Sequence, residues 1–222
     1  MNEVKLVALT KPTDIGDGTA EGAIAYMARV SNPANQDSPQ GVDKLIRYLI
    51  RNEHWSPFEM ISIVMEIKTT RDISRQILRH RSFSFQEFSQ RYAVVNSFSA
   101  DREARLQDEK NRQNSIELGA SEDEKMLSIE FERAQKRVLF AAQKEYDWAI
   151  NNGIAKEQAR ALLPEGLTLS TLYMSGTLRS WIHYCQLRMA NGTQKEHAEI
   201  AKKCWEVIQD YFPNVVKALE QQ

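Results

Sequence analysis

Residues 61–68 constrain the fold more than any other segment, because their side chains alternate in kind along the chain. The apolar members are Ile61, Ile63, Met65 and Ile67, and the polar members are Ser62, Glu66 and Lys68. Successive side chains of a β-strand point to opposite faces, so this pattern directs one face into a core and the other toward solvent. The segment is predicted to be a strand half-buried in a sheet.

Patterns on both sides of this strand predict one domain that mixes strands and helices. A chain of 222 residues is long enough to bury a core without disulfides or a structural metal. Further strands are expected at 4–9 and 167–175, and helices at 20–30, 42–51, 70–79, 121–151, 156–163 and beyond 177. The polar stretch 97–120 lacks a sustained period and is predicted to be a long surface loop with short helical pieces.

Two capping boxes are expected at the starts of late helices. Ser121 is followed by Glu124 and Thr193 by Glu196, a spacing in which side chains and backbone exchange hydrogen bonds. The last helix is predicted to turn five apolar residues inward: Ile200, Cys204, Val207, Ile208 and Tyr211. Both cysteines, Cys185 and Cys204, fall on or beside apolar helix faces, so buried thiols are expected rather than a disulfide framework.

The charge balance restricts the class of ligand. The chain has 29 basic and 30 acidic residues, a net charge of −1, whereas domains that bind nucleic acid over a broad surface are usually markedly basic. Its arginine clusters are therefore expected to bind a small anion. No apolar run approaches the roughly 20 residues of a membrane span, and the first ten residues resemble a strand rather than a secretory signal, so a cytoplasmic protein is expected.

The segment from Gln76 to Tyr92 carries the densest group of functional side chains. Its sequence, Gln-Ile-Leu-Arg-His-Arg-Ser-Phe-Ser-Phe-Gln-Glu-Phe-Ser-Gln-Arg-Tyr, sets fixed cationic donors beside hydroxyl, amide and carboxylate groups, interleaved with aromatic rings. Such a set suits a phosphorylated, planar ligand. A purely structural alternative is that Arg79 and Arg81 meet the carbonyls and the negative dipole at a helix C-terminus.

This segment resembles the signature of the flavin-dependent thymidylate synthases, which is Arg-His-Arg, seven residues, then Ser. All four motif positions are present here, as Arg79, His80, Arg81 and Ser89. Three further segments match the family in order: His-x-Ser-Pro-Phe-Glu at 54–59, Ala-Arg-x-x-Leu-Pro at 159–164, and Leu-Arg at 187–188. The resemblance extends from about residue 19 to residue 212. Thr177 stands where many members of the family have Asn.

The resemblance implies a fold, a reaction and an assembly. Members of the family have an α+β fold, a curved mixed β-sheet flanked by long α-helices in a single domain, here residues 1–222. They methylate dUMP to dTMP with 5,10-methylenetetrahydrofolate as one-carbon donor, FAD as flavin and NADPH as reductant. A homotetramer with shared active sites is implied on the same ground. The sequence has no Gly-x-Gly-x-x-Gly or Walker-type loop, so side chains at subunit junctions are expected to bind the dinucleotide.

Site residues follow from the resemblance position by position. Those implied for dUMP are Gln76, Arg79, Glu87, Ser89, Gln90, Arg91, Arg160 and Arg188. Those implied for FAD are His54, Ser56, Glu59, Arg79, His80, Arg81, Glu87 and His183. Arg188 is the expected catalytic residue, because a permanent cation can stabilise negative charge on the uracil ring as one ring carbon becomes nucleophilic. An alternative is that Arg188 only packs beside Trp181 and pairs with a carboxylate.

Other functions fit the sequence less well. A single-stranded nucleic-acid-binding module would use the Arg/aromatic segment 75–92, with phosphates on the arginines and bases on the rings, but it leaves Arg188 and the loop at 54–59 without a role. A flavin-free thymidylate synthase would need a cysteine nucleophile in a loop, and both cysteines fall in predicted helices. Ser89 lacks a recognisable base partner, and the four histidines lack the spacing of a zinc site. No metal is expected.

Overall fold

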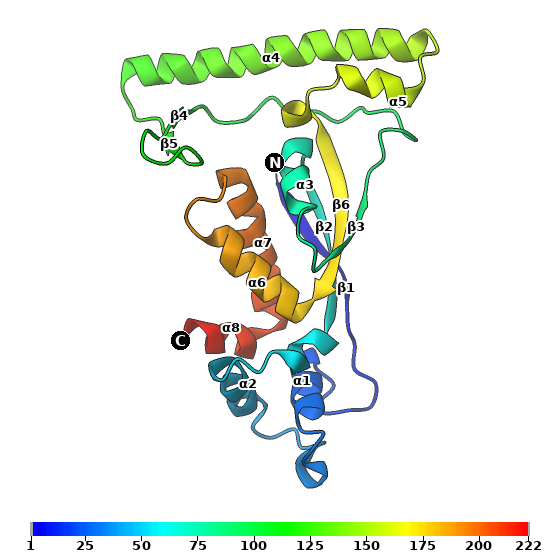
Figure 1. Cartoon of the computed structure of the whole chain (residues 1–222), viewed down its shortest axis with the longest axis vertical. Coiled ribbons are helices and arrows are strands. Elements are labelled where there is room, and N and C mark those ends of the chain that lie inside the picture. Colours follow the sequence, from blue (N-terminus) through cyan, green and yellow to red (C-terminus); the bar gives the residue numbers. More distant parts are fainter. Residues whose placement is uncertain (1, 222) are drawn as a thin grey trace.

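A computed structural model describes residues 2–221, and its centre is a four-stranded sheet in the order β1-β2-β6-β3 (Figure 1). The strands are β1 (Glu3–Leu9), β2 (Ser62–Thr70), β3 (Ser84–Glu87) and β6 (Leu169–Thr177). Every neighbouring pair is antiparallel, so the expected mixed sheet is wrong. The reason is that β6 lies between β2 and β3 and pairs antiparallel with each, so the two strands that run in the same direction are not neighbours.

The alternation in β2 has the predicted effect. Ile63, Met65 and Ile67 are almost fully buried, while Ser62 and Lys68 are exposed. In the register with β6, Met65 faces Met174 and Ile67 faces Leu172, and both partners are also buried. One face of the sheet therefore supplies the floor of the main core.

Helices from both ends of the chain cover this face. They are α6 (Leu178–Met189), α7 (Lys195–Tyr211) and α8 (Pro213–Glu220) from the C-terminal part, with α1 (Ala20–Ala28) and α2 (Val42–Arg51) at the lower end of Figure 1. Trp181 on α6 is fully buried, and its indole N–H donates to the carbonyl of Ile63, 3.2 Å away. The main core is thus closed by the chain itself.

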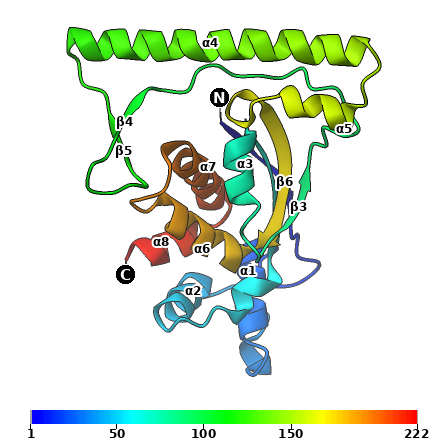
Figure 2. The same ribbon diagram turned by 45° about the horizontal axis from the view of Figure 1, so that its top comes forward.

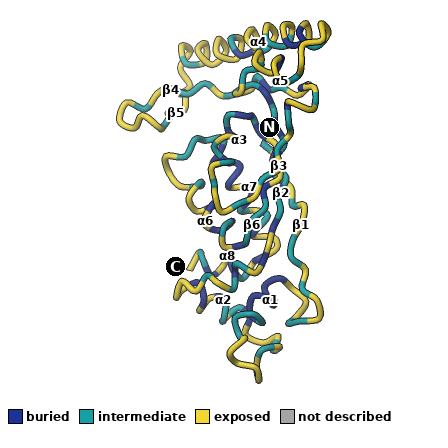
Figure 3. The backbone as a smooth tube through the Cα atoms, turned by 45° about the vertical axis from the view of Figure 1, so that its right-hand side comes forward, coloured by how far each residue is buried: buried dark blue, intermediate teal, exposed yellow. Residues whose placement is uncertain are grey.

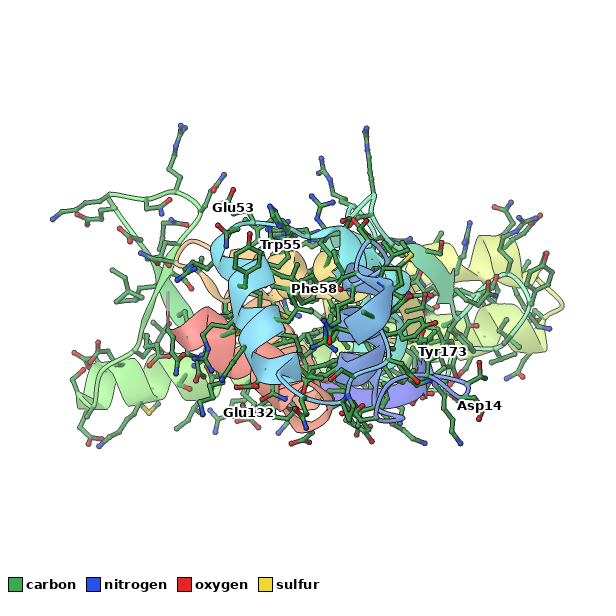
Figure 4. The ribbon with its side chains drawn as sticks, turned by 90° about the horizontal axis from the view of Figure 1, so that it is seen from below. Asp14, Glu53, Trp55, Phe58, Glu132 and Tyr173 are labelled. Atoms are coloured by element: carbon green, nitrogen blue, oxygen red, sulfur yellow. The ribbon has the colours of Figure 1, made fainter. Side chains whose placement is uncertain are left out.

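Short one-turn helices connect these elements. They are η1 (Pro33–Asn35), η2 (Ser56–Met60), η3 (Arg160–Leu162) and η4 (Glu165–Leu167). Viewed from below, Phe58 of η2 lies between α1 and α2, and it is fully buried (Figure 4). This anchor fixes the loop that leads from α2 into β2.

Residues 97–163, which we call the arm, lie across the upper end of the sheet, and the other described residues form the body (Figures 1 and 2). The arm contains α4 (Glu122–Asn151), α5 (Lys156–Ala159), and a hairpin of β4 (Arg105–Gln107) and β5 (Ser115–Glu117). The hairpin corrects the prediction for 97–120, because the regular structure there is a pair of short strands and not short helical pieces. Ser121 and Glu124 form the predicted capping box.

Two predictions for the last long helix are wrong. The Thr193–Glu196 capping box does not form: α7 begins at Lys195, and no side chain caps it. Glu196 instead accepts hydrogen bonds from Arg105, at 2.5 Å, and from the Gln194 side chain, at 2.9 Å. Tyr211 is half exposed because it is the last helical residue.

The remaining predictions for this helix are confirmed for Ile200, Cys204 and Ile208, which are fully buried, whereas Val207 is half-buried. Cys185 and Cys204 are free, buried thiols, and burial raises the pKa of each. Among residues 2–221, no helix has the length and apolar character needed to cross a membrane.

Candidate functional site

The transition from β6 into α6 brings several predicted flavin residues together. Thr177 ends β6 and caps α6, since its hydroxyl accepts a hydrogen bond from the Ser180 N–H at 3.2 Å. The same hydroxyl donates to a carboxylate oxygen of Glu59, 2.7 Å away. One residue therefore starts the helix and also ties it to η2.

Glu59 is the polar centre of this junction. Besides Thr177, it accepts a hydrogen bond from the Arg179 guanidinium at 2.7 Å. The hydrogen bond from Thr177 and the charge of Arg179 hold the pKa of Glu59 below its usual value, so the group is a carboxylate at neutral pH. Next to it, His183 packs edge-on against Trp55, with ring centroids 4.8 Å apart.

The loop before η2 adds two exposed side chains to this junction. His54 lies edge-on to Tyr48, with a centroid separation of 5.9 Å, and Ser56 is exposed at the start of η2. Four of the five flavin residues predicted outside Arg-His-Arg therefore come from η2, the loop before it, and α6, and the fifth, Glu87, ends β3.

The Arg-His-Arg motif follows α3 (Arg71–Ile77), which ends two residues earlier than predicted. Arg79 and Arg81 are exposed, and within residues 2–221 neither forms an ion pair. Their charges are therefore available to a ligand instead of being neutralised by the chain. His80 between them turns inward and is half-buried.

His80 meets the predicted catalytic arginine. Arg188, at the end of α6, donates its Nε–H to His80 Nε2 at 2.9 Å. The two residues are 108 positions apart in sequence. Burial, followed by the charge of Arg188, lowers the pKa of His80 to about 4, so the imidazole is neutral at physiological pH. Arg188 therefore pairs with a neutral ring and not with the carboxylate of the packing alternative.

Buried aromatic rings support this contact. Tyr184 stands edge-on to His80 with centroids 4.9 Å apart, and Phe83 stands edge-on to Trp181 at the same separation. Phe83 reaches its place only because residue 176 is glycine, since a Cβ there would lie 2.4 Å from the Phe83 ring. The rings of this wall come from α6 and from Phe83 just before β3, and β6 makes room for them at Gly176.

A second histidine lies behind this wall. His197 of α7 is fully buried, and its Nε2 is 3.1 Å from the hydroxyl of Tyr184. Burial is the main cause that lowers the pKa of His197 to about 3, with smaller contributions from Arg188 and His80. Its Nδ1 is buried without a hydrogen-bond partner among the described residues. The interior here admits a neutral imidazole only.

Glu87, predicted to contact both ligands, is held by its own chain. One carboxylate oxygen accepts hydrogen bonds from Ser74 at 2.6 Å and Ser170 at 2.9 Å, and the guanidiniums of Arg75 and Arg71 lie 3.5 and 3.7 Å away. Because these four side chains come from α3 and β6, Glu87 joins the two elements. A ligand would share this carboxylate with them.

Gln76 is also engaged within the chain, where its amide N–H donates to Gln194 Oε1 at 2.7 Å. Gln194 in turn donates to Glu196 at 2.9 Å, which links the motif to the start of α7. The sequence pattern did not single out Gln194, because a contact across 118 residues leaves no local signal.

The remaining nucleotide residues lie in a second group near α5. Ser89 accepts a hydrogen bond from the backbone N–H of Arg91 at 3.4 Å, and Gln90 is buried. The Arg91 guanidinium is 3.3 Å from the Glu157 carboxylate, and Arg160 donates to the Glu157 carbonyl at 3.2 Å. Figures 1 and 2 show α5 at the arm and α6 in the body, so one chain does not bring these arginines to Arg188.

Sequence reasoning missed three residues that organise the site: Arg179, Tyr184 and His197. Arg179 had a usable signal, because it lies four positions before His183 and so shares a helix face with it. The Tyr184–His197 contact joins two helices and had none. No group of three potential metal-ligating side chains occurs among the described residues.

Comparisons with known proteins agree over nearly the whole chain. The family model described as thymidylate synthase complementing protein matches residues 15–214. A probable flavin-dependent thymidylate synthase of Paramecium bursaria Chlorella virus 1 is 49% identical over 97% of this chain and 98% of its own length. The flavin-dependent thymidylate synthase of Synechocystis is 48% identical over 98% and 99%.

A solved structure shows the same fold. The UMP/dUMP methylase PolB from Streptomyces cacaoi, bound with 5-Br dUMP, superposes with a TM-score of 0.81 at 27% sequence identity. The alignment covers 100% of this chain and 95% of that one. The likeness therefore includes both body and arm.

Proposed function

The chain belongs to the thymidylate synthase complementing protein family, the flavin-dependent thymidylate synthases, and from this premise we propose how its residues divide the work. The protein is an FAD-dependent enzyme that methylates dUMP to dTMP, with a folate, 5,10-methylenetetrahydrofolate, as the one-carbon donor. NADPH is the proposed reductant. The contact between His80 and Arg188 carries the proposal, because it unites the signature motif with the arginine expected to act on the substrate ring.

The nucleotide site is proposed to centre on Arg188, with Gln76, Arg79, Glu87, Ser89, Gln90, Arg91 and Arg160 as the other substrate residues. Arg188 would face the uracil ring and stabilise the negative charge that develops on it when a ring carbon acts as nucleophile. Arg91 and Arg160 would bind the phosphate, for which planar guanidiniums are well suited. Both are exposed, although each also contacts Glu157, so a phosphate would share or replace those contacts.

The flavin site is proposed to comprise His54, Ser56, Glu59, Arg79, His80, Arg81, Glu87 and His183. A dinucleotide brings a diphosphate, and the unpaired, exposed guanidiniums of Arg79 and Arg81 provide the matching charge. When bound, FAD supplies the redox chemistry of the reaction. The residues at the η2–α6 junction would fix its position, and the Thr177 hydroxyl holds Glu59 as a carboxylate there.

We further propose that residues 1–222 act as one domain within a homotetramer that shares its active sites. Two observations support assembly. The phosphate arginines lie near α5, away from Arg188, so a complete site calls for residues from more than one copy (Figure 1). In addition, α4 leaves seven large apolar side chains exposed: Met126, Leu127, Ile129, Phe131, Val138, Phe140 and Trp148. Such a surface on a single helix is typical of a protein interface.

An anaerobic assay tests the reaction. Purified protein is mixed with FAD, NADPH, dUMP and methylenetetrahydrofolate, dTMP is followed by chromatography, and each component is omitted in turn. Product formation that requires all four is expected. Absence of product from protein that binds FAD and has been reduced would refute the assignment of substrate.

Two variants test the division of roles within the nucleotide site. Arg188→Ala is expected to retain FAD and lose most turnover, because it removes charge stabilisation that matters chiefly in the transition state. Arg91→Ala is expected mainly to weaken dUMP binding. Full turnover by the first variant, or unchanged dUMP affinity in the second, would contradict the respective role.

A further inference from the structure

We propose that His80 is a positioning residue for Arg188: its ring nitrogen Nε2 holds the guanidinium at Nε and leaves both Nη groups free for the substrate ring. This inference rests on the proposed role of Arg188. It gives His80 a task beyond the flavin contact that the family resemblance implies for it.

The geometry of the contact fixes the state of the imidazole. A guanidinium is always protonated, so Arg188 can only donate, and Nε2 of His80 must present a lone pair at 2.9 Å. The ring is therefore neutral with its proton on Nδ1. That N–H remains directed away from Arg188, so His80 can donate to a bound cofactor while it accepts from the arginine.

The choice of a neutral acceptor preserves the charge of Arg188. A carboxylate at this place would form an ion pair and compete with the negative charge that develops on the ligand. The carboxylates of the region are engaged elsewhere: Glu59 with Arg179, Glu87 with Ser74 and Ser170, and Glu196 with Arg105. Among the described residues, neither Nη group of Arg188 has an ion-pair or hydrogen-bond partner.

The imidazole is itself held on several sides. Tyr184 is edge-on to it with centroids 4.9 Å apart, His197 with centroids 6.2 Å apart, and Phe83 with centroids 6.4 Å apart. Its backbone N–H donates to the Ile77 carbonyl at 3.1 Å. Tyr184 and Arg188 lie one turn apart on α6, so a single helix carries both the wall behind His80 and the group that His80 holds.

The expected benefit is preorganisation. An arginine side chain loses substantial rotamer freedom when it is fixed, and a hydrogen bond at Nε fixes the plane of the guanidinium before the substrate arrives. The two Nη groups then present a fork in one orientation. Loss of His80 should leave a mobile cation that binds the uracil ring less well at every stage of the reaction.

Three substitutions separate this role from others. His80→Gln places an amide oxygen where Nε2 lies and keeps the acceptor; His80→Leu fills similar space without one; His80→Glu keeps an acceptor but neutralises Arg188. Each is made in the full-length protein and compared for FAD content, dUMP affinity of the FAD-loaded enzyme, and kcat and KM. His80→Asn, whose shorter amide stops short of Arg188, replaces the leucine variant if the latter fails to fold.

We expect the glutamine variant to remain within about threefold of wild type in kcat/KM for dUMP. The leucine variant is expected to lose about 10- to 100-fold, the usual weight of a hydrogen bond to a charged group, and the glutamate variant at least as much. Because His80 is also placed at the flavin site, FAD content is measured for each variant, and kcat/KM is compared with FAD at saturation. In an Arg188→Ala background, His80→Leu should have no further effect, because a residue that acts through another is silent in its absence.

Two results would overturn the inference. One is a loss of FAD from the leucine variant with dUMP affinity intact, which would make His80 a flavin ligand alone. The other is a further tenfold loss of kcat/KM on adding His80→Leu to Arg188→Ala. Failure of the proposed function is distinguishable, since it would appear as wild-type protein that forms no dTMP.

Discussion

The body and the arm bury apolar surface to very different degrees. In the body, the inward face of β2 and the matching side chains of β6 are almost completely covered by helices of the same chain. In the arm, the 30-residue α4 buries only Gln135, Tyr146 and Ala149, and Figure 3 shows most of that helix as exposed. The difference indicates that contacts within the chain stabilise the body, whereas the apolar side chains of the arm remain free to contact another molecule.

Between the arm and the body, hydrogen bonds and ion pairs are prominent. Arg102 of the arm reaches Asp72 at 2.6 Å and Thr70 at 2.7 Å, and Arg105 reaches Glu196 at 2.5 Å. Lys195 of the body pairs with Glu103 and Glu117, each at 2.7 Å. These polar contacts, with a small apolar cluster around Val95 and Tyr146, orient the arm on the body. The core of the body, the exposed surface of the arm and the contacts between them can each be tested by substitution.

The largest effect is expected on the exposed surface of the arm. Phe140 on α4 has an exposed fraction of 73%. In the proposed assembly, Phe140→Glu places a charge in an apolar interface, so the protein should dissociate and lose at least tenfold in dTMP formation. Light scattering and the anaerobic assay measure the two changes together.

Phe140→Leu is the matched control for this surface and should retain the assembly. The body should fold normally in both variants, with an unchanged far-UV circular dichroism spectrum. If Phe140→Glu keeps the wild-type mass and activity, this part of α4 is not an interface, and the contrast between arm and body needs another explanation.

In the body, the largest effect is expected from a cavity. Ile67 is fully buried opposite Leu172. Ile67→Ala should lower the free energy of unfolding by about 2–5 kcal/mol, because the side chain is removed and the rigid surroundings fill the space only in part. Denaturant titration at two protein concentrations measures it, and the loss should be similar at both. A loss below about 1 kcal/mol would show that this core is loosely packed.

Acid should weaken the body through a buried histidine. The pKa of His197 is lowered to about 3 in the folded protein, against about 6.5 when unfolded. The unfolded state therefore binds the extra proton, so stability is fully present above about pH 6.5 and is lost as the pH falls toward 3. From pH 7 to pH 5 the loss from this residue should be about 2 kcal/mol.

His197→Gln removes this titration and keeps a polar group toward Tyr184. Its free energy of unfolding should fall less steeply between pH 7 and pH 5, by the same about 2 kcal/mol. Parallel curves for wild type and variant would mean that His197 is solvated or charged in the folded state. The arm has no histidine. Its contribution to the pH dependence of unfolding should therefore be the same in wild type and variant.

The smallest effect is expected at the junction of arm and body. Arg102→Met removes the partly buried pair with Asp72 and should cost about 1–2 kcal/mol, because a hydrogen-bonded carboxylate is left without its cation. Hydrogen exchange in residues 97–120 should report the loosening first. Lys136→Ala is the control: its pair with Glu132 lies exposed on the surface of α4, where solvent screens it, so no measurable loss of stability is expected.

Sequence patterns predicted the body better than they predicted the site. The alternation in β2 is a local signal and was confirmed, as were the inward positions Ile200, Cys204 and Ile208 of α7. The Thr193–Glu196 capping box failed because Arg105, from the distant hairpin, takes the carboxylate. The antiparallel pairing of the sheet could not be predicted from the sequence pattern. It depends on β6 lying between β2 and β3, which no local pattern shows.

For the candidate site, the family resemblance identified the functional side chains, and the structure showed which residues hydrogen-bond to them. Arg188 was expected from a Leu-Arg pair late in the sequence, but nothing local indicated that His80 would accept its hydrogen bond. The same holds for Gln76 with Gln194. Such pairs join elements more than a hundred residues apart, so their presence follows from tertiary packing and not from spacing.

The position of β6 between β2 and β3 also has a consequence during synthesis. The contact between Trp181 and Ile63 spans 118 residues, so β2 leaves the ribosome long before the strand and helix that cover it. At a translation rate of about 5–20 residues per second this delay is roughly 6–24 s, an interval in which the edge of β2 opposite β1 is uncovered and prone to join another chain. Glu66 and Lys68 on its opposite face are charges of the kind that oppose such pairing.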